Sequence, residues 1–171
     1  ASYHQLAVAA GQLKRSSEVL DFRRKSLAVY EHLSASDPQD KNSRMHRVYS
    51  MALLAEALAE ENQMDAAEAI LVQAQQLQDV TDPESAKQVF HRASGFMLPT
   101  VRAVIEAHRA MLPGVSATTR VLGCERARAA YNDAKTAANG LKDLFLDQAE
   151  DPLAETTKRM RPCAAVIPFP L

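Results

Sequence analysis

The chain has no tryptophan and few glycines, and these shortages argue against an all-β fold. Its 171 residues contain only 5 glycines, and aromatic residues make up 5% of the total. Sheet proteins need glycine in their tight turns and favour aromatic side chains on their strands. Hydrophobic residues reach 47%, and alanine, leucine, glutamate, glutamine, lysine and arginine are abundant. This composition predicts one all-helical domain with enough apolar surface for a core.

An excess of positive charge and a long apolar run are also missing. The formal net charge is -1, so the chain lacks the basic field that holds a phosphate backbone. No stretch approaches the roughly 20 apolar residues that a membrane span needs. Short basic clusters at 44–47, 126–128 and 158–161 have no interleaved aromatic residues, so we interpret them as solvated faces. We therefore expect neither a nucleic-acid partner nor a membrane span.

Motifs for catalysis and for cofactors are missing too. The 5 histidines form no H-x-x-x-H or HExxH pattern, the glycines stand alone, and no G-x-S-x-G element occurs. Cys124 and Cys163 give neither a disulfide framework nor a metal spacing, and we interpret both as ordinary apolar residues, with a single bridge left open. The sequence predicts no catalytic, cofactor-binding or metal-binding residues, no small-molecule substrate and no enzyme.

The strongest pattern in the chain is a pair of helices between residues 48 and 77. Apolar residues recur at steps of three or four, stop over 60–63, and then resume. Asn62 suits the left-handed backbone of a tight turn, and Asp65 suits a helix start. Helices with so short a link pack antiparallel. The apolar positions are Val48, Met51, Leu54, Ala55, Leu58, Met64, Ala67, Ile70, Leu71, Ala74 and Leu77.

This pair resembles the tetratricopeptide repeat in its order of small and large residues. Asn62 replaces the family's turn glycine, and the family's aromatic signature residues are absent. A plain antiparallel hairpin from a helical bundle is the alternative, because the same small-and-large pattern serves both. The matching residues are Leu54, Ala55 and Leu58 in the first helix and Ala67, Leu71 and Ala74 in the second.

Two further pairs are predicted on either side of the central one. The first occupies 1–14 and 18–33, with Ser16-Ser17 as the cap of its second helix, and Arg23 falls where Leu71 stands in the central pair. Residues 41–44 are predicted to be a polar linker or frayed turn. The third pair occupies 84–98 and 101–111, broken by Gly95 and Pro99 and with Thr100 capping its second helix.

The C-terminal third is predicted to close the stack. A loop is expected over 115–123 and a long closing helix over 125–150, followed by a short helix to about residue 160. Prolines at 162, 168 and 170 then favour an extended tail. The apolar residues of this tail are predicted to dock on a partner, with packing on their own domain as the alternative. They are Val166, Ile167, Phe169 and Leu171.

The expected fold is thus an all-α solenoid of about three antiparallel helix pairs, with a helical domain at 1–150 and a short helix and extended tail at 151–171. The resemblance implies protein–protein binding on the concave surface of the first helices. The residues expected there are Tyr3, Tyr49, Ala52 and Glu56. Some members of the family clamp the C-terminal carboxylate of a chaperone with Lys and Asn, and these residues are missing from the matching positions.

Two functions follow from this interpretation. The first is a non-enzymatic scaffold or adaptor that binds protein partners within a larger assembly. The alternative is a structural accessory subunit built permanently into a large multi-protein complex, such as one associated with an organelle membrane. The chain begins with alanine, and we expect an intracellular location, with an organelle after leader removal as the alternative.

Overall fold

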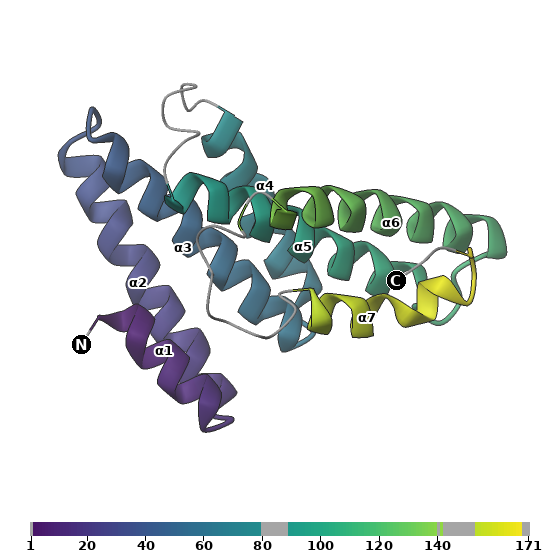
Figure 1. The fold of residues 1–171 in the computed structure, drawn as a ribbon. Coiled ribbons are helices and arrows are strands. Elements are labelled where there is room, and N and C mark those ends of the chain that lie inside the picture. Colours follow the sequence, from purple (N-terminus) through teal and green to yellow (C-terminus); the bar gives the residue numbers. More distant parts are fainter. Residues whose placement is uncertain (1, 80–88, 140, 142–152, 169–171) are drawn as a thin grey trace. The chain divides into compact units, whose positions relative to one another are not determined.

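The computed structural model describes residues 2–79, 89–139, 141 and 153–168 (Figure 1). Over these residues the chain forms seven α-helices and no strand, which confirms the all-helical prediction. The chain divides into two compact units, Ala1–Ser94 and Gly95–Leu171. This boundary lies inside the fifth helix, whereas the boundary that the sequence predicts between 150 and 151 lies outside the described residues.

Unit 1 consists of helices that pack on one another in chain order. The first four helices pack in three successive pairs, the first on the second, the second on the third and the third on the fourth, and short turns join the members of each pair (Figure 1). The first six residues of the fifth helix complete the unit. The helices are α1 (Tyr3–Gln12), α2 (Ser16–Ser36), α3 (Lys41–Glu60), α4 (Met64–Asp79) and α5 (Val89–Ala110).

The α3–α4 hairpin confirms the central pair. All five apolar positions predicted for its first helix are buried, and Asn62 adopts a left-handed backbone with φ 58° in the turn. Asp65 lies in the first turn of α4, where a negative charge complements the helix dipole. In α4 the residues at the predicted small-large-small positions, Ala67, Leu71 and Ala74, are at most 2% exposed.

Two predicted helix starts were wrong. α2 begins at Ser16 with Arg15 as its N-cap, and no side chain caps it, so Ser16-Ser17 is not the cap. The predicted linker at 41–44 is the first turn of α3. Asp40 accepts a hydrogen bond from the Asn42 amide at 2.9 Å and another from the Ser43 hydroxyl, so it caps a helix that begins earlier than apolar periodicity suggested.

The break predicted in the third pair was also wrong. α5 runs from Val89 to Ala110 with Pro99 inside it, so Thr100 is not a cap and the predicted third hairpin does not form. The Thr100 hydroxyl donates to the Phe96 carbonyl at 2.8 Å, one turn back. Leu98 and Val101 are buried on either side. Tertiary packing therefore holds a helix through a proline that removes one backbone donor. Residues 84–88 of the prediction lie outside the described residues.

Unit 2 is built on the remainder of α5, on α6 (Ala117–Asn139) and on α7 (Ala154–Ala164). α6 begins where a loop was predicted, because the Ser116 hydroxyl accepts from the Thr119 amide at 3.1 Å and starts the helix. The described part of α6 ends at Asn139, and residues 142–150 of the predicted closing helix lie outside the described residues. The core around α6 and α7 contains Ala103, Ala107, Ala110, Cys124, Ala127, Ala130, Tyr131, Ala134, Leu153, Met160, Cys163 and Ile167.

The predicted extended tail is helical over its first residues. α7 continues through Pro162 to Ala164, and the amide of Ile167 then donates to the Cys163 carbonyl at 3.0 Å in a turn. Pro162 removes one backbone donor from this last turn, and Cys163 beside it is bonded to α6, which holds the turn in place. Residues 169–171 of the predicted tail lie outside the described residues.

Candidate protein-binding surface

Five aromatic rings form a connected row in unit 1. The centroids of His4 and Tyr49 are 6.2 Å apart, and Tyr49 meets Phe90 edge-on at 5.4 Å. Phe90 lies 3.9 Å from His46, which stacks on Tyr30 at 4.8 Å. The rings come from α1, α2, α3 and α5, so the row ties four helices together. All five side chains are half-buried, which leaves part of the row open to solvent.

One face of α3 organises the row. His46, Tyr49, Leu53, Glu56 and Glu60 follow one another at steps of three or four, so they lie on the same side of the helix. The N-terminal half of this face carries rings and its C-terminal half carries carboxylates. The face therefore offers a partner both apolar area and negative charge. We use the name α3 face for this side of α3 together with the five rings of the aromatic row.

Arg23 of α2 brings a positive charge to the same surface. Its guanidinium Nη1 donates to Nδ1 of His4 at 2.9 Å, which requires the proton of the neutral imidazole on Nε2. Burial lowers the pKa of Arg23, and the nearby charges of Glu56, Tyr49 and Glu60 act in the opposite direction. The arginine is thus a fixed link between α1, α2 and α3.

The pKa values of His4, His46 and Tyr49 are shifted in the direction that favours their neutral forms. Burial lowers the pKa of His4, and the charge of Arg23 adds to this effect. Burial also lowers the pKa of His46, against the attraction of Asp40. The pKa of Tyr49 is raised, mainly by burial. The row therefore acts as an apolar surface with a few fixed hydrogen-bonding groups.

A cavity of about 250 Å³ lies between the α1–α2 turn and the C-terminal end of α3. Its charged lining residues are Lys14, Arg15, Glu60 and Glu61. Glu60 also belongs to the α3 face, so the cavity adjoins the carboxylate half of that face. Lys14 has a left-handed backbone, with φ 56°, which turns the chain sharply from α1 into α2.

The residues predicted for partner binding have different positions. Tyr49 and Glu56 lie on the α3 face. Tyr3 is 41% exposed on α1 but is not one of the five rings of the row. Ala52 is completely buried, so it serves the contact between helices and is inaccessible to a partner.

The predicted tail residues do not form a free docking strand over the part that the structure describes. Ile167 is only 9% exposed and belongs to the core of unit 2, and Val166 packs against that core. The chain thus packs on its own unit here, which was the alternative in the sequence interpretation. Phe169 and Leu171 lie outside the described residues.

The sequence missed the other four rings of the row, His4, Tyr30, His46 and Phe90, and it missed Arg23. Arg23 left one signal in the sequence, because an arginine stands where the repeat pattern calls for a large apolar residue. The four rings left none, since histidine, tyrosine and phenylalanine on a helix face are common in ordinary cores.

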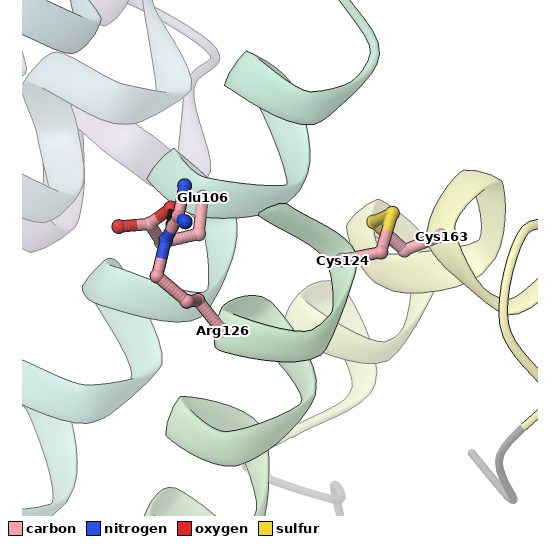
Figure 2. Close-up of a disulfide and its surroundings, with 4 residues drawn as sticks. All are labelled: Glu106, Cys124, Arg126 and Cys163. Carbon is pink, nitrogen blue, oxygen red and sulfur yellow. Dashed lines mark hydrogen bonds and ion pairs between the residues drawn. A yellow bond between two sulfur atoms is a disulfide. The ribbon is translucent and has the colours of Figure 1, made fainter. Parts of the chain in front are cut away.

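Unit 2 contains a covalent link that the sequence left open. Cys124 of α6 and Cys163 of α7 form a disulfide, so interpreting them as ordinary apolar residues was wrong (Figure 2). Both residues are completely buried. Nearby, Nε of Arg126 lies 2.8 Å from Oε2 of Glu106 and ties α6 to α5.

The described residues hold no group of three or more histidine, cysteine or acidic residues that could bind a metal ion. Within the same residues no helix is both long and apolar enough to cross a membrane. Comparison with protein-family models, with curated proteins and with solved structures found no match.

Proposed function

We propose that this chain is a non-enzymatic protein-binding scaffold of tetratricopeptide-like type, and that a partner segment binds across the α3 face. The observation that carries the proposal is the aromatic row. Aromatic residues and arginine are enriched where proteins bind one another, because aromatic rings combine a large apolar area with few rotatable bonds and arginine offers several hydrogen-bond donors.

The order of the helices supports the solenoid arrangement. His4, Tyr49 and Phe90 come from α1, α3 and α5, which are alternate helices along the chain. In a stack of helical hairpins, the first helices of successive hairpins line one surface. These three rings on alternate helices are the pattern that such a surface would produce, and Tyr30 of α2 joins the row through its stacking on His46.

The rings are held in place by neighbouring side chains, which favours binding with little loss of conformational entropy. Tyr49 is wedged between His4 and Phe90, and the Arg23–His4 hydrogen bond fixes the α1 end of the row. Side chains that are already ordered lose little freedom when a partner arrives. The ring half is suited to an apolar anchor of the partner, and the carboxylate half lies beside it on the same helix face.

The experiment selects peptides from a random phage-displayed library on the purified full chain and then measures their affinity for variants. Tyr49→Ala and Phe90→Ala each remove one ring, and Val72→Ala, which shortens an exposed α4 side chain away from the row, is the matched control. We expect the ring variants to lose about tenfold or more in affinity and the control to keep it. Circular dichroism confirms that each variant is folded.

Peptides that bind the ring variants as tightly as the parent chain would refute the α3 face as the binding surface. Gel filtration of the same preparation separates the scaffold from the alternative, an accessory subunit built into a large complex. A scaffold is a stable monomer alone, whereas a permanent subunit aggregates or unfolds without its neighbours.

A further inference from the structure

We propose that the Cys124–Cys163 disulfide is a conditional clasp: oxidation holds α7 on the alanine-rich core of unit 2, and reduction releases it. The two cysteines are 39 residues apart in the chain and join α6 to α7 (Figure 2). This inference concerns unit 2 and is independent of the binding surface proposed for unit 1.

α7 has little capacity to form by itself. It has only 11 residues, its N-cap Leu153 makes no side-chain hydrogen bond, and Pro162 lies inside its last turn. Isolated helices shorter than about 12 residues are marginal in water. The helix therefore depends on contacts with the rest of unit 2.

In the described part of unit 2, α7 packs through one buried face. Its buried residues are Thr156, Met160 and Cys163, and Leu153 and Ile167 flank it in the same core. Among the described residues, a side-chain hydrogen bond between the hydroxyls of Thr157 and Tyr131, at 2.9 Å, joins α7 to α6. The ion pairs of Glu155 with Lys158 and with Arg159 lie within the helix itself.

The surface beneath α7 consists mainly of alanine. Alanine buries little area for each residue, so a helix docked on such a surface gains less than one docked on leucine or phenylalanine. A cross-link compensates by confining the unfolded chain, and this effect grows with the length of the closed loop. The disulfide is thus the strongest single reason for α7 to stay in place.

The chemistry of the clasp is thiol–disulfide exchange. On closing, the two thiols lose two protons and two electrons to a disulfide oxidant, which becomes two thiols, and the sulfur–sulfur bond forms. On opening, a dithiol reductant gives back the electrons and protons and is itself converted to a disulfide. Because both cysteines are completely buried, the reductant reaches the bond during transient opening of unit 2, and reduction then lets α7 stay undocked.

The disulfide also indicates the redox environment in which unit 2 completes its fold. Disulfides of this kind persist in oxidising compartments and are rare where glutathione and thioredoxin keep thiols reduced. The complete fold of unit 2 therefore belongs to an oxidising environment, and in a reducing one the chain would carry α7 undocked.

The test compares three forms of the full chain by hydrogen exchange and thermal unfolding. These are the air-oxidised protein, the protein reduced with a phosphine and alkylated, and the double variant Cys124→Ser with Cys163→Ser. Opening the disulfide should raise amide exchange in α7 about tenfold or more and leave α3 and α4 unchanged. Loss of a cross-link that closes a loop of this length should lower the melting temperature of unit 2 by about 15 °C.

Reductant added to the double variant is the matched control and should change nothing. Continued protection of α7 in the reduced protein would overturn the proposal, as would a mass of the oxidised protein that shows two free thiols. If the double variant fails to fold, the time course of exchange in the parent chain after reductant is added still decides. The proposal requires α7 to lose protection before α5 and α6, and simultaneous loss contradicts it.

Discussion

The helices of each unit pack around a core, but the two cores are built from different residue types. In unit 1, α3 and α4 bury large side chains against one another, among them Met51, Leu54 and Leu71. In unit 2, half of the residues in the core around α6 and α7 are alanine, and a disulfide crosses that core. Large side chains bury enough area to hold a hairpin unaided, whereas small ones let helices approach closely but contribute less burial.

The comparison extends to the surface of each unit. The surface groups of unit 1 interact across helices through rings and through Arg23, and this gives it a pre-ordered surface suited to recognition. In unit 2 the described ion pair between helices, Arg126 with Glu106, has an arginine that is 60% exposed. Such surface pairs contribute at most about 1 kcal/mol. Unit 2 therefore depends on its covalent link more than on its surface.

The largest expected effect is a core truncation in unit 1. Leu71→Ala removes a side chain that is 2% exposed between α3 and α4, and we expect a loss of about 3 kcal/mol in the free energy of unfolding. Hydrogen exchange resolved along the chain should show the loss in α3 and α4. A loss of protection as large in α6 would show that the two units do not differ in the way proposed.

A smaller effect is expected from adding a methyl group where α5 and α6 approach each other closely. A Cβ added at Gly123 would lie 2.8 Å from Cβ of Ala110, so Gly123→Ala must push α6 away from α5. We expect a destabilisation of about 2 kcal/mol, measured by chemical denaturation.

The matched glycine in unit 1 should respond in the opposite sense. A Cβ at Gly11 meets only Val19, at an ordinary 3.9 Å, and the residue lies inside α1. Gly11→Ala should therefore stabilise the chain by about 0.5 to 1 kcal/mol, because alanine is the better helix former. Equal changes in the free energy of unfolding for the two substitutions would show that α5 and α6 do not pack more closely than α1 and α2.

The turn of the α3–α4 hairpin should show a cost of about 1 kcal/mol. Asn62→Ala keeps a Cβ in a left-handed backbone but removes the side-chain amide that can hydrogen-bond locally. Asn62→Gly is the control, since glycine adopts this conformation freely and should cost nothing measurable at this position. If alanine and glycine give the same midpoint in urea, the backbone conformation of residue 62 does not limit the stability of unit 1.

The smallest effect is a dependence of unit 1 on pH. The pKa values of His4 and His46 are lowered in the folded state, so the unfolded chain binds more protons as the pH falls below about 6.5. The contribution of these neutral rings is complete above that pH and is lost as the pH falls through the folded pKa values. We expect the melting temperature of unit 1 to decrease between pH 7 and pH 5, by less than in the core variant.

The control for this pH effect is His46→Phe, which keeps a ring beside Tyr30 and Phe90 but removes one titrating group. Its melting temperature should change less with pH than that of the parent chain. An unchanged pH profile in the variant would mean that His46 is not one of the groups responsible.

The sequence predicted most of unit 1 because its signals are local. Steps of three and four in apolar residues identified α3 and α4, and Asn62 correctly placed the turn between them. The same reasoning failed at Pro99 and Pro162, where helices continue through prolines. A local rule describes the preference of an isolated segment, and packing of neighbours such as Leu98, Val101 and Cys163 overrides that preference.

Only some residues of the candidate surface could be predicted from the sequence. Tyr49 and Glu56 followed from their place in the repeat pattern, whereas the contacts with His4, Arg23 and Phe90 join helices far apart in the sequence. Ala52 was assigned to the surface because small residues give no sign of whether they face a partner or a neighbouring helix. Its burial became clear only from the packing of α3.

By itself, the sequence determined that this chain is helical, which hairpin is strongest and where that hairpin turns, since each of these depends on residues a few positions apart. Only the tertiary structure decided that Cys124 and Cys163 meet, that five rings from four helices form a row, and that α5 stays continuous through Pro99. The physical reason is that these features arise from contacts between distant segments, and their energies depend on how whole helices pack.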